Sequence, residues 1–401
     1  MSKIDELIQE LCPNGVEYKE LGAVEDSGII KLGRGNVISK TDIVGSPGDY
    51  PVYSSSAAGS GEFGRYGKYM FDDERITWSI DGGGRFFYRT AHKYSVTNVS
   101  GWLKVIKIDI LDIKFLYYVL TDIWKTKAYD YTKKAHPSII RNEYIIPIPP
   151  LPIQQEIVRI LDNFTKLEAE LEAELEARKK QYEYYRNQLL TPIEIDGKWF
   201  INGKEAKWKA LGDVCKFMNG KGHEKFINEE GSYIVVNSKF ISTEGKVKKY
   251  SIEQLSPVYK DDLLMVMSDL PNGRALAKCY IVEADNKYTL NQRICALSVK
   301  ITSEVNSKYL FYACNRNNQL LRFDNGADQT NLRKDDILKI LIPIPPFEEQ
   351  ERITAILDIF DALVNDISIG LPAEIEARRK QYEYYRGKLL TFQNKAEAQE
   401  A

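Results

Sequence analysis

The sequence predicts an α+β (mixed α/β) protein in which two similar globular domains are separated by two long antiparallel spacer helices that form a coiled coil. The chain of 401 residues repeats itself once, so its halves should be related by a pseudo-two-fold axis. Each copy ends in a segment whose apolar residues lie three or four apart, which is typical of a helix packed on another helix. The rest of each copy holds short apolar runs bounded by turn residues, which indicate strands.

The internal repeat consists of two well-matched segments per copy. Residues 145–167 recur as 341–363 with an offset of 196, and residues 176–191 recur as 376–391 with an offset of 200. The four additional residues amount to about one helical turn, so the helical faces on either side stay nearly in phase.

This repeat divides the chain into seven segments. We expect an N-terminal helix (1–15), a first globular domain (16–145), a first spacer helix (146–192), a linker (193–206), a second globular domain (207–342), a second spacer helix (343–392) and a tail (393–401).

Each spacer helix should begin directly after a proline-rich stretch, because proline does not fit a helix interior. Residues 153–190 would form a rod of about 57 Å. Gly370 and Pro372 should break or kink the second spacer helix. Within the first, LEAE, LEAE and LEAR follow one another over 167–178. Good helix formers explain this composition, but the repetition suggests a length adjuster that adds about 6 Å for each unit of four residues.

The globular domains should contain many short strands and one helix each. The strands are expected at 75–80, 102–108, 232–236 and 293–301, and the helices at 115–120 and 309–314. Residues 114–120 also resemble residues 308–314, which extends the repeat into these domains.

Composition limits the class of protein. The apolar content of 43% supports a folded core, and the net charge of −2 excludes a uniformly basic surface. Five cysteines without a C-x-x-C pair and only three histidines argue against a disulfide framework and against a metal site. The N-terminal residues lack a signal sequence and no run is long enough to span a bilayer, so we expect a soluble, cytoplasmic protein without membrane contact.

Positive charge is concentrated in the globular domains, where a polyanion would bind. Residues 16–145 hold 18 Lys and Arg against 16 Asp and Glu, and residues 207–342 hold 21 against 16, whereas both spacer helices are acidic. Arg can read guanine edges, and Asn or Gln can read adenine. The candidate DNA-binding residues are Arg85, Tyr88, Arg89, His92, Lys93, Lys133, Lys134, His136, Asn219, Lys221, His223, Lys225, Lys246, Lys248, Lys249, Asn272, Arg274, Gln329, Asn331 and Arg333. For any single one of them, an ordinary solvated surface charge is the favoured explanation over a DNA contact.

No catalytic motif is supported. GSGEFG at 59–64 matches a dinucleotide-binding pattern but lacks the preceding strand and following helix, so a glycine-rich turn is expected there. The glycines at 82–84 and 220–222 lack the spacing of a phosphate-binding loop, and no Ser-His-Asp set is evident.

The repeated P-I-P-P-[LF]-x-x-Q segments, the repeated E-A-R-[KR]-K-Q-Y-E-Y-Y-R helix ends and the LEAE tandem together resemble the DNA-specificity subunit of type I restriction-modification enzymes. The resemblance covers essentially the whole chain. It implies that each globular domain is a target recognition domain for one half of a split sequence in double-stranded DNA. It also implies a non-catalytic chain, whose spacer helices set the distance between the half-sites and dock two methyltransferase subunits.

According to this resemblance, S-adenosylmethionine is bound by the methyltransferase partner and no cofactor by this chain. The sequence leaves open whether a restriction/translocase subunit, which would use ATP and Mg, joins the complex. The candidate spacer and partner-docking residues are Gln154, Phe164, Leu167, Leu171, Leu175, Tyr182, Tyr185, Gln350, Phe360, Leu363, Tyr382 and Tyr385.

Two alternatives remain open at this point. A coiled-coil scaffold with two protein-binding globular ends would explain the tyrosine-rich helix ends equally well, because aromatic residues are enriched at interfaces generally. It explains the separation of charge less well. A self-sufficient methyltransferase is the weaker alternative.

Overall fold

The computed structural model describes residues 3–56, 59–130, 132–271, 273–365 and 369–396 of the chain. The chain divides into two compact units. Unit 1 comprises Met1–Leu171 and Ile375–Ala401, and unit 2 comprises Glu172–Glu374. Each unit therefore combines a globular domain with parts of the long helices.

The globular domain of unit 1 is built on an antiparallel four-stranded sheet with the order β2-β8-β5-β6. These strands are Ile30–Arg34, Ser100–Val105, Arg75–Ser79 and Phe86–Arg89. A second sheet, β4-β3-β7, contains Glu62–Tyr66, Tyr50–Tyr53 and Ser95–Val96, and a strand pair joins β1 (Tyr18–Glu20) to β9 (Ile145–Pro147). The helices of this part are α1 (Lys3–Leu11), α2 (Leu21–Asp26), α3 (Lys40–Gly45), α4 (Ile113–Lys125) and α5 (Pro137–Glu143).

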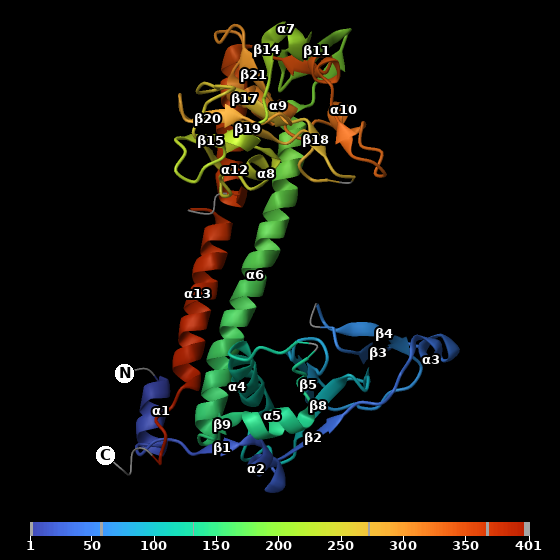
Figure 1. The fold of residues 1–401 in the computed structure, drawn as a ribbon, viewed down its shortest axis with the longest axis vertical. Helices are drawn as coiled ribbons and strands as arrows, with labels where there is room; N and C mark the ends of the chain where they lie inside the picture. The colour runs from blue at the N-terminus through green and yellow to red at the C-terminus, as the bar shows by residue number, and fades with distance from the viewer. Residues whose placement is uncertain (1–2, 57–58, 131, 272, 366–368, 397–401) are drawn as a thin grey trace. The chain divides into compact units, whose positions relative to one another are not determined.

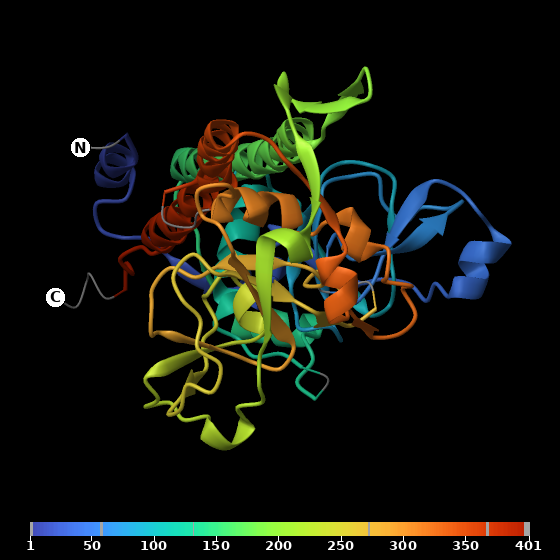
Figure 2. The same ribbon diagram turned by 90° about the horizontal axis from the view of Figure 1, so that it is seen from above.

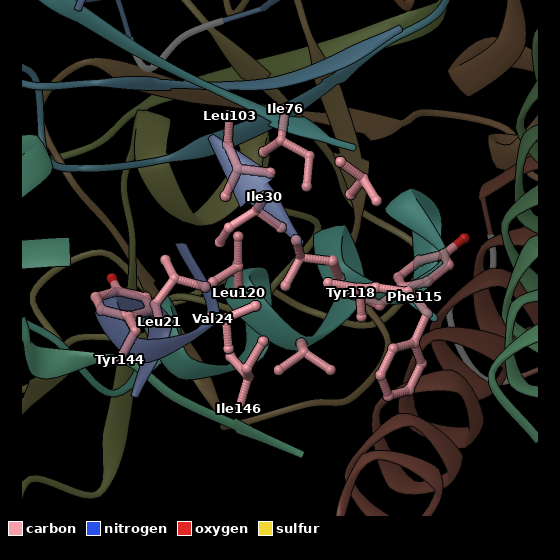
Figure 3. Packing of buried hydrophobic residues seen from close by; sticks show 14 of the residues in the cluster. Leu21, Val24, Ile30, Ile76, Leu103, Phe115, Tyr118, Leu120, Tyr144 and Ile146 are labelled. Atoms are coloured by element: carbon pink, nitrogen blue, oxygen red, sulfur yellow. The ribbon is translucent and has the colours of Figure 1, made fainter. Parts of the chain in front are cut away.

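The core of unit 1 lies between the four-stranded sheet and α4. Every residue of β5 is buried, and α4 directs Phe115, Leu116 and Leu120 onto the sheet. Asp112 caps α4 by accepting hydrogen bonds from the first backbone amides of the helix. Figure 3 shows this packing around Leu21, Val24, Ile30, Ile76, Leu103, Phe115, Tyr118, Leu120, Tyr144 and Ile146.

Unit 2 contains an antiparallel four-stranded sheet with the order β14-β21-β17-β19 and a three-stranded sheet with the order β16-β15-β20. These strands are Cys215–Asn219, Ile294–Val299, Leu263–Val266, Cys279–Ile281, Tyr250–Ser251, Tyr233–Val236 and Tyr288–Leu290. Smaller sheets contain β13 (Lys207–Ala210) with β23 (Leu341–Ile344), β18 (Ser268–Asp269) with β22 (Thr330–Asn331), and the meander β10 (Ile193–Ile195), β11 (Lys198–Ile201) and β12 (Lys204–Glu205). The short helices are α7 (Leu211–Val214), η1 (Glu224–Phe226), α8 (Ser238–Ser242), α9 (Ser307–Cys314), α10 (Asn318–Leu321) and α11 (Lys334–Leu338).

The two globular domains share one topology. In both, strands in the same sequential positions build the four-stranded antiparallel sheet. Each three-stranded sheet has one antiparallel neighbour and one parallel neighbour around its central strand, β3 in unit 1 and β15 in unit 2. The strand pair β13-β23 repeats β1-β9. The prediction of two similar mixed α/β domains is therefore confirmed.

The long helices begin where the prolines predict. Helix α6 (Leu151–Leu190) has 40 residues and starts immediately after Pro150, and α12 (Phe347–Asn365) starts immediately after Pro346. The preceding strands β9 and β23 end in the same proline-rich segments. Proline thus separates the last strand of each domain from the spacer helix.

The second spacer helix is interrupted, as Gly370 and Pro372 predict. A new helix, α13 (Leu371–Leu390), begins directly after Gly370, whose carbonyl oxygen accepts a hydrogen bond from the amide of Ala373 at 3.0 Å. Pro372 occupies the first turn of α13, where its missing N–H is not needed. Residues 366–368 lie outside the described part of the chain.

The spacer helices pair antiparallel within each unit. In unit 1, α6 lies along α13, with Phe164 against Tyr385 and Glu168 against Arg379 (Figure 1). Residue numbers rise along α6 as they fall along α13, which defines the antiparallel direction. In unit 2, the later part of α6 packs on α12 in the same way.

The two ends of the described chain meet in unit 1. The amide of Val16 donates to the carbonyl of Gln393 at 2.8 Å, and the hydroxyl of Tyr18 donates to the carbonyl of Phe392 at 3.1 Å. In both views α1 and the end of α13 lie close together (Figures 1 and 2). Within the described ranges, no helix combines the length and apolar content needed to cross a membrane.

Candidate nucleic-acid interface

In unit 1 most candidate DNA-binding residues lie on loops around the four-stranded sheet, whereas Tyr88 and Arg89 lie on its strand β6. The exposed candidates are Arg85, Lys93 and Lys133. The half-buried candidates are Tyr88, His92, Lys134 and His136. Lys133 is only loosely paired with Glu143, at 3.9 Å, whereas Lys134 is held by Asp81 at 3.1 Å. The exposed cations thus remain able to contact a polyanion.

The prediction that Arg89 faces DNA is wrong, because this side chain is buried in unit 1. Its Nε donates to Thr77 Oγ1 at 3.0 Å, and its Nη2 donates to the carbonyl of Ser60 at 2.8 Å. The guanidinium lies 3.6 Å from the centre of the Tyr53 ring. Burial lowers the pKa of Arg89. The residue ties β6 to the loop before β4, and its guanidinium is occupied by contacts within unit 1.

His92 and Lys93 lie against tyrosine rings, an arrangement that the sequence did not predict. The ring nitrogens of His92 contact the carbonyl of Thr90 and the hydroxyl of Tyr53, so the imidazole is fixed. The ammonium of the exposed Lys93 lies 4.9 Å from the Tyr69 ring centre. A positive charge held over an exposed ring is suited to phosphate or base contacts.

A cavity of about 760 Å³ lies beside these loops in unit 1. Ser54, Phe63 and Tyr129 line it together with Asp81 and Gly82. A Cβ atom at Gly82 would lie 1.8 Å from the carbonyl oxygen of Ser55, so only glycine permits this close approach. Gly82 and Gly83 therefore form part of the cavity wall.

In unit 2 most candidate residues are exposed. The exposed residues are Asn219, Lys221, Lys225, Lys246, Lys248, Lys249, Arg274, Gln329, Asn331 and Arg333. Asn272 lies outside the described residues.

His223 is the exception, and its predicted contact with DNA is wrong. The imidazole is fully buried, with Nε2 2.8 Å from Thr289 Oγ1 and Nδ1 2.8 Å from the carbonyl of Lys221. The hydroxyl of Thr289 also accepts a hydrogen bond from the amide of Ser256. His223 therefore anchors the loop that presents Lys221 and Lys225.

Three predicted residues meet at one small cavity in unit 2. Gln329, Asn331 and Arg333 line a space of about 340 Å³. Strand β22 pairs Asn331 with Ser268 of β18, and the Gln329 side chain donates to the Ser268 hydroxyl at 2.7 Å. This pairing brings residues 329–333 next to Ser268 and Asp269. An amide, a second amide and a guanidinium on one edge match the donors that read adenine and guanine.

Gln154 and Gln350 are fully buried, so their side chains hold the spacer helices in place and are not exposed for the predicted contact with a partner. In unit 1, Gln154 Nε2 donates to the carbonyls of Ile110 and Pro149, and Oε1 accepts from the amide of Asp112. In unit 2, Gln350 repeats these contacts with the carbonyls of Glu304 and Pro345 and the amide of Asn306. Each glutamine thus fastens the start of a spacer helix to the loop before α4 or α9.

A second duplicated contact was missed by sequence reasoning. Asp162 on α6 accepts from the Tyr118 hydroxyl and pairs with Lys114, both at 2.6 Å. In unit 2, Asp358 on α12 makes the corresponding contacts, with the Tyr312 hydroxyl at 2.7 Å and Lys308 at 2.5 Å. Recurrence of Lys, Tyr and Asp in both copies was the available signal.

The remaining spacer candidates form two equivalent aromatic surfaces. In unit 1, Phe164 contacts Tyr382 and Tyr385, and Leu167 is exposed. In unit 2, Phe360 stacks on Tyr185, Leu363 is exposed, and Tyr182 packs toward the core. Leu171 and Leu175 are half-buried.

One tyrosine projects outward on each surface. Tyr384 is 68% exposed in unit 1 and Tyr184 is 63% exposed in unit 2. We call Phe164, Leu167, Tyr384 and Tyr385 the first aromatic surface, and Tyr184, Tyr185, Phe360 and Leu363 the second aromatic surface.

A family model for the type I restriction modification DNA specificity domain matches the chain twice, over residues 15–177 and 204–377. The chain is 35% identical over 295 residues to the specificity subunit of the type I restriction enzyme EcoR124I/EcoR124II from Escherichia coli, and the match covers 70% of this chain and 71% of that protein.

The fold is similar to two solved structures. One is the S subunit of a type I restriction-modification system from M. genitalium, with a TM-score of 0.55, 16% identity, and coverage of 94% of this chain and 96% of that chain. The other comes from a structure of complex assembly and conformational transition in the type I R-M system, with a TM-score of 0.63, 14% identity, and coverage of 95% and 98%. At these identities the likeness concerns the fold.

Proposed function

The chain belongs to the family of type I restriction-modification DNA specificity domains, and we propose that each of its two globular domains reads one half of a split DNA target. The observation that carries this proposal is a shared sheet topology with unlike exposed side chains. Unit 1 presents Lys93 over tyrosine rings, whereas unit 2 presents Gln329, Asn331 and Arg333 at one cavity. Two globular domains that share a fold but differ in their exposed side chains are suited to recognising two different half-sites.

Direct reading of bases is assigned to the unit 2 cavity, and backbone contact to the lysines. Arg pairs bidentately with guanine, and Asn or Gln with adenine, in the major groove. The exposed Lys246, Lys248 and Lys249 lie on one loop and would neutralise phosphates. In this division the lysines set affinity and the cavity sets sequence preference.

The reaction itself is assigned to partner subunits. The two aromatic surfaces are equivalent, which suits two copies of one partner, and exposed aromatic residues are enriched at protein interfaces. We assign these partners as methyltransferase subunits that bring S-adenosylmethionine, in a complex that acts on double-stranded DNA in the cytoplasm. A restriction/translocase subunit, where one joins, would bring ATP and Mg.

Methylome sequencing tests this function directly. The chain is expressed with its methyltransferase subunits in a host that lacks other DNA methylation. A bipartite motif with a fixed gap is expected, and a contiguous motif or no motif would overturn the proposal. Arg333→Ala should relax the half-site read by unit 2 and leave the other half unchanged, whereas Lys216→Ala, an exposed cation outside the proposed loops, serves as the control.

A further inference from the structure

Unit 2 contains a cavity of about 400 Å³ at the C-terminal end of α6. Its lining includes Arg186, Asn187, Trp208, Arg316 and Asn318. None of these residues belongs to the proposed DNA-reading loops or to the second aromatic surface. We call this space the α6-end cavity.

The repeat shows what is unusual about the α6-end cavity. Arg186 corresponds to Arg386 in the second copy of the helix end. In unit 1, Arg386 Nε donates to Asp122 Oδ1 at 3.0 Å, and the arginine side chain is 9% exposed. The residue that corresponds to Asp122 in unit 2 is Arg316, because residues 114–120 match residues 308–314. Unit 2 thus keeps the arginine but replaces its carboxylate with a second cation.

Neither arginine of the α6-end cavity forms an ion pair among the residues that the structure describes. Arg186 donates to the carbonyls of Tyr312, at 2.9 Å and 3.2 Å, and of Asn315. Arg316 Nη1 donates to the carbonyls of Leu276, at 3.0 Å, and Gly273, at 3.3 Å. Carbonyl oxygens orient a guanidinium but do not neutralise its charge.

The charge of the cavity therefore favours an anion. Glu183 is the one acidic residue in the lining, and it is exposed, so the two guanidiniums outweigh it. Guanidinium groups bind phosphate through short charge-assisted hydrogen bonds. Two guanidiniums carry two positive charges, so a doubly charged phosphate suits them better as a ligand than a singly charged carboxylate does. The amides of Asn187 and Asn318 can supply further donors.

We propose that the α6-end cavity binds a phosphate group, presented either as free phosphate or on a small nucleotide. Its volume is in the range that holds a small organic ligand. Trp208, which is 38% exposed, offers a ring face for a nucleobase. This inference does not depend on DNA recognition, because it concerns the end of the spacer helix.

The experiment is calorimetric titration of the full chain with inorganic phosphate and, separately, with AMP. One saturable site is expected for at least one probe. If AMP binds at least tenfold more tightly than inorganic phosphate, and Trp208→Ala reduces that affinity, the ligand is a nucleotide. Equal affinity for both probes would identify phosphate alone as the ligand. Absence of a saturable site for either probe would overturn the proposal.

Arg316→Asp is the decisive variant, because it restores the arginine–carboxylate pair that already exists in unit 1. It should fold, as judged by its melting temperature, and lose about tenfold or more in affinity for the bound probe. Arg316→Gln, which removes the charge without adding a carboxylate, should show a loss in the same direction. Arg322→Ala, an exposed arginine outside the cavity, is the matched control. Unchanged binding in both Arg316 variants would refute the site.

Discussion

Phe164 on α6 and Tyr385 on α13 stack with ring centres 5.6 Å apart and an angle of 26° between their planes. Unit 2 contains the same contact with the roles exchanged, since Phe360 on α12 stacks on Tyr185 of α6 at 5.5 Å and 27°. In each unit, the phenylalanine comes from the start of one spacer helix and the tyrosine from the end of the other. This reciprocity explains why a sequence repeat produces an antiparallel pair of helices.

The stacked pairs and the projecting tyrosines should respond differently to substitution. Phe164→Ala removes a half-buried ring between two helices and should lower the free energy of unfolding of unit 1 by about 1–3 kcal/mol. Tyr384→Ala should change stability by less than about 1 kcal/mol, because that ring is mostly exposed. Urea denaturation of the isolated chain measures both changes.

Tyr384 should matter more for partner binding than for stability. We expect Tyr384→Ala and Tyr184→Ala to weaken assembly with the methyltransferase subunits by about 1–2 kcal/mol each, as for aromatic interface residues. Analytical ultracentrifugation of the reconstituted complex measures this loss. If both variants assemble like the parent chain, the aromatic surfaces do not bind the partner.

The buried glutamines should be indispensable for attaching each domain to its spacer helix. Gln154→Leu leaves the amide of Asp112 and two carbonyls without partners, which should cost about 3 kcal/mol in unit 1. Hydrogen exchange should then accelerate in α4, whereas Gln350→Leu should accelerate it in α9. Gln155→Leu alters an exposed neighbour and should leave both helices protected. Equal protection in all three variants would show that the glutamines contribute little.

Local features of the chain could be predicted from the sequence, whereas the burial of individual side chains could not. The prolines, the repeat and Gly370 predicted both helix starts and the break, because these are local effects of backbone chemistry. Burial of Arg89 and His223 could not be predicted, since it depends on Ser60 and Thr289, which are distant in the chain. The sequence placed most recognition candidates of unit 2 on exposed loops, because clustered Lys and Asn between strands are typical of turns.

Acid should weaken unit 1 through Glu156. This carboxylate pairs with Arg159 at 2.6 Å and with Lys3 at 3.1 Å, and its hydrogen bond from Arg159 is the main cause that lowers its pKa from 4.5 to about 2. Because the pKa is lower in the folded state, the stabilisation is complete above about pH 4.5 and is lost as the pH falls toward 2.

Melting curves between pH 7 and pH 2 test this dependence. Glu156→Gln should destabilise unit 1 at pH 7 and show a shallower decline in acid than the parent chain. Glu170→Gln, on the exposed face of the same helix, should follow the parent curve. Parallel curves for Glu156→Gln and the parent would contradict the linkage.

Affinity and sequence preference should separate between Lys249 and Arg333. Arg333→Ala should cost about 1–3 kcal/mol for the cognate half-site and relax its sequence preference. Lys249→Ala should weaken binding to all sequences and reduce the slope of log affinity against log salt by about 1. Fluorescence anisotropy at several salt concentrations, with cognate and scrambled duplexes, distinguishes the two. A uniform loss for Arg333→Ala would place it among the phosphate contacts instead.

The length of α6 should control the gap between the half-sites. The LEAE unit at 171–174 lies inside a continuous helix and contributes about 6 Å to it. DNA rises 3.4 Å per base pair, so deleting this unit should shorten the recognised gap by about one or two base pairs while both half-sites keep their sequences. Methylome sequencing of the deletion strain reads the gap directly, with Glu170→Gln as a variant of unchanged length. If the gap stays the same, the tandem supports the helix without setting the spacing.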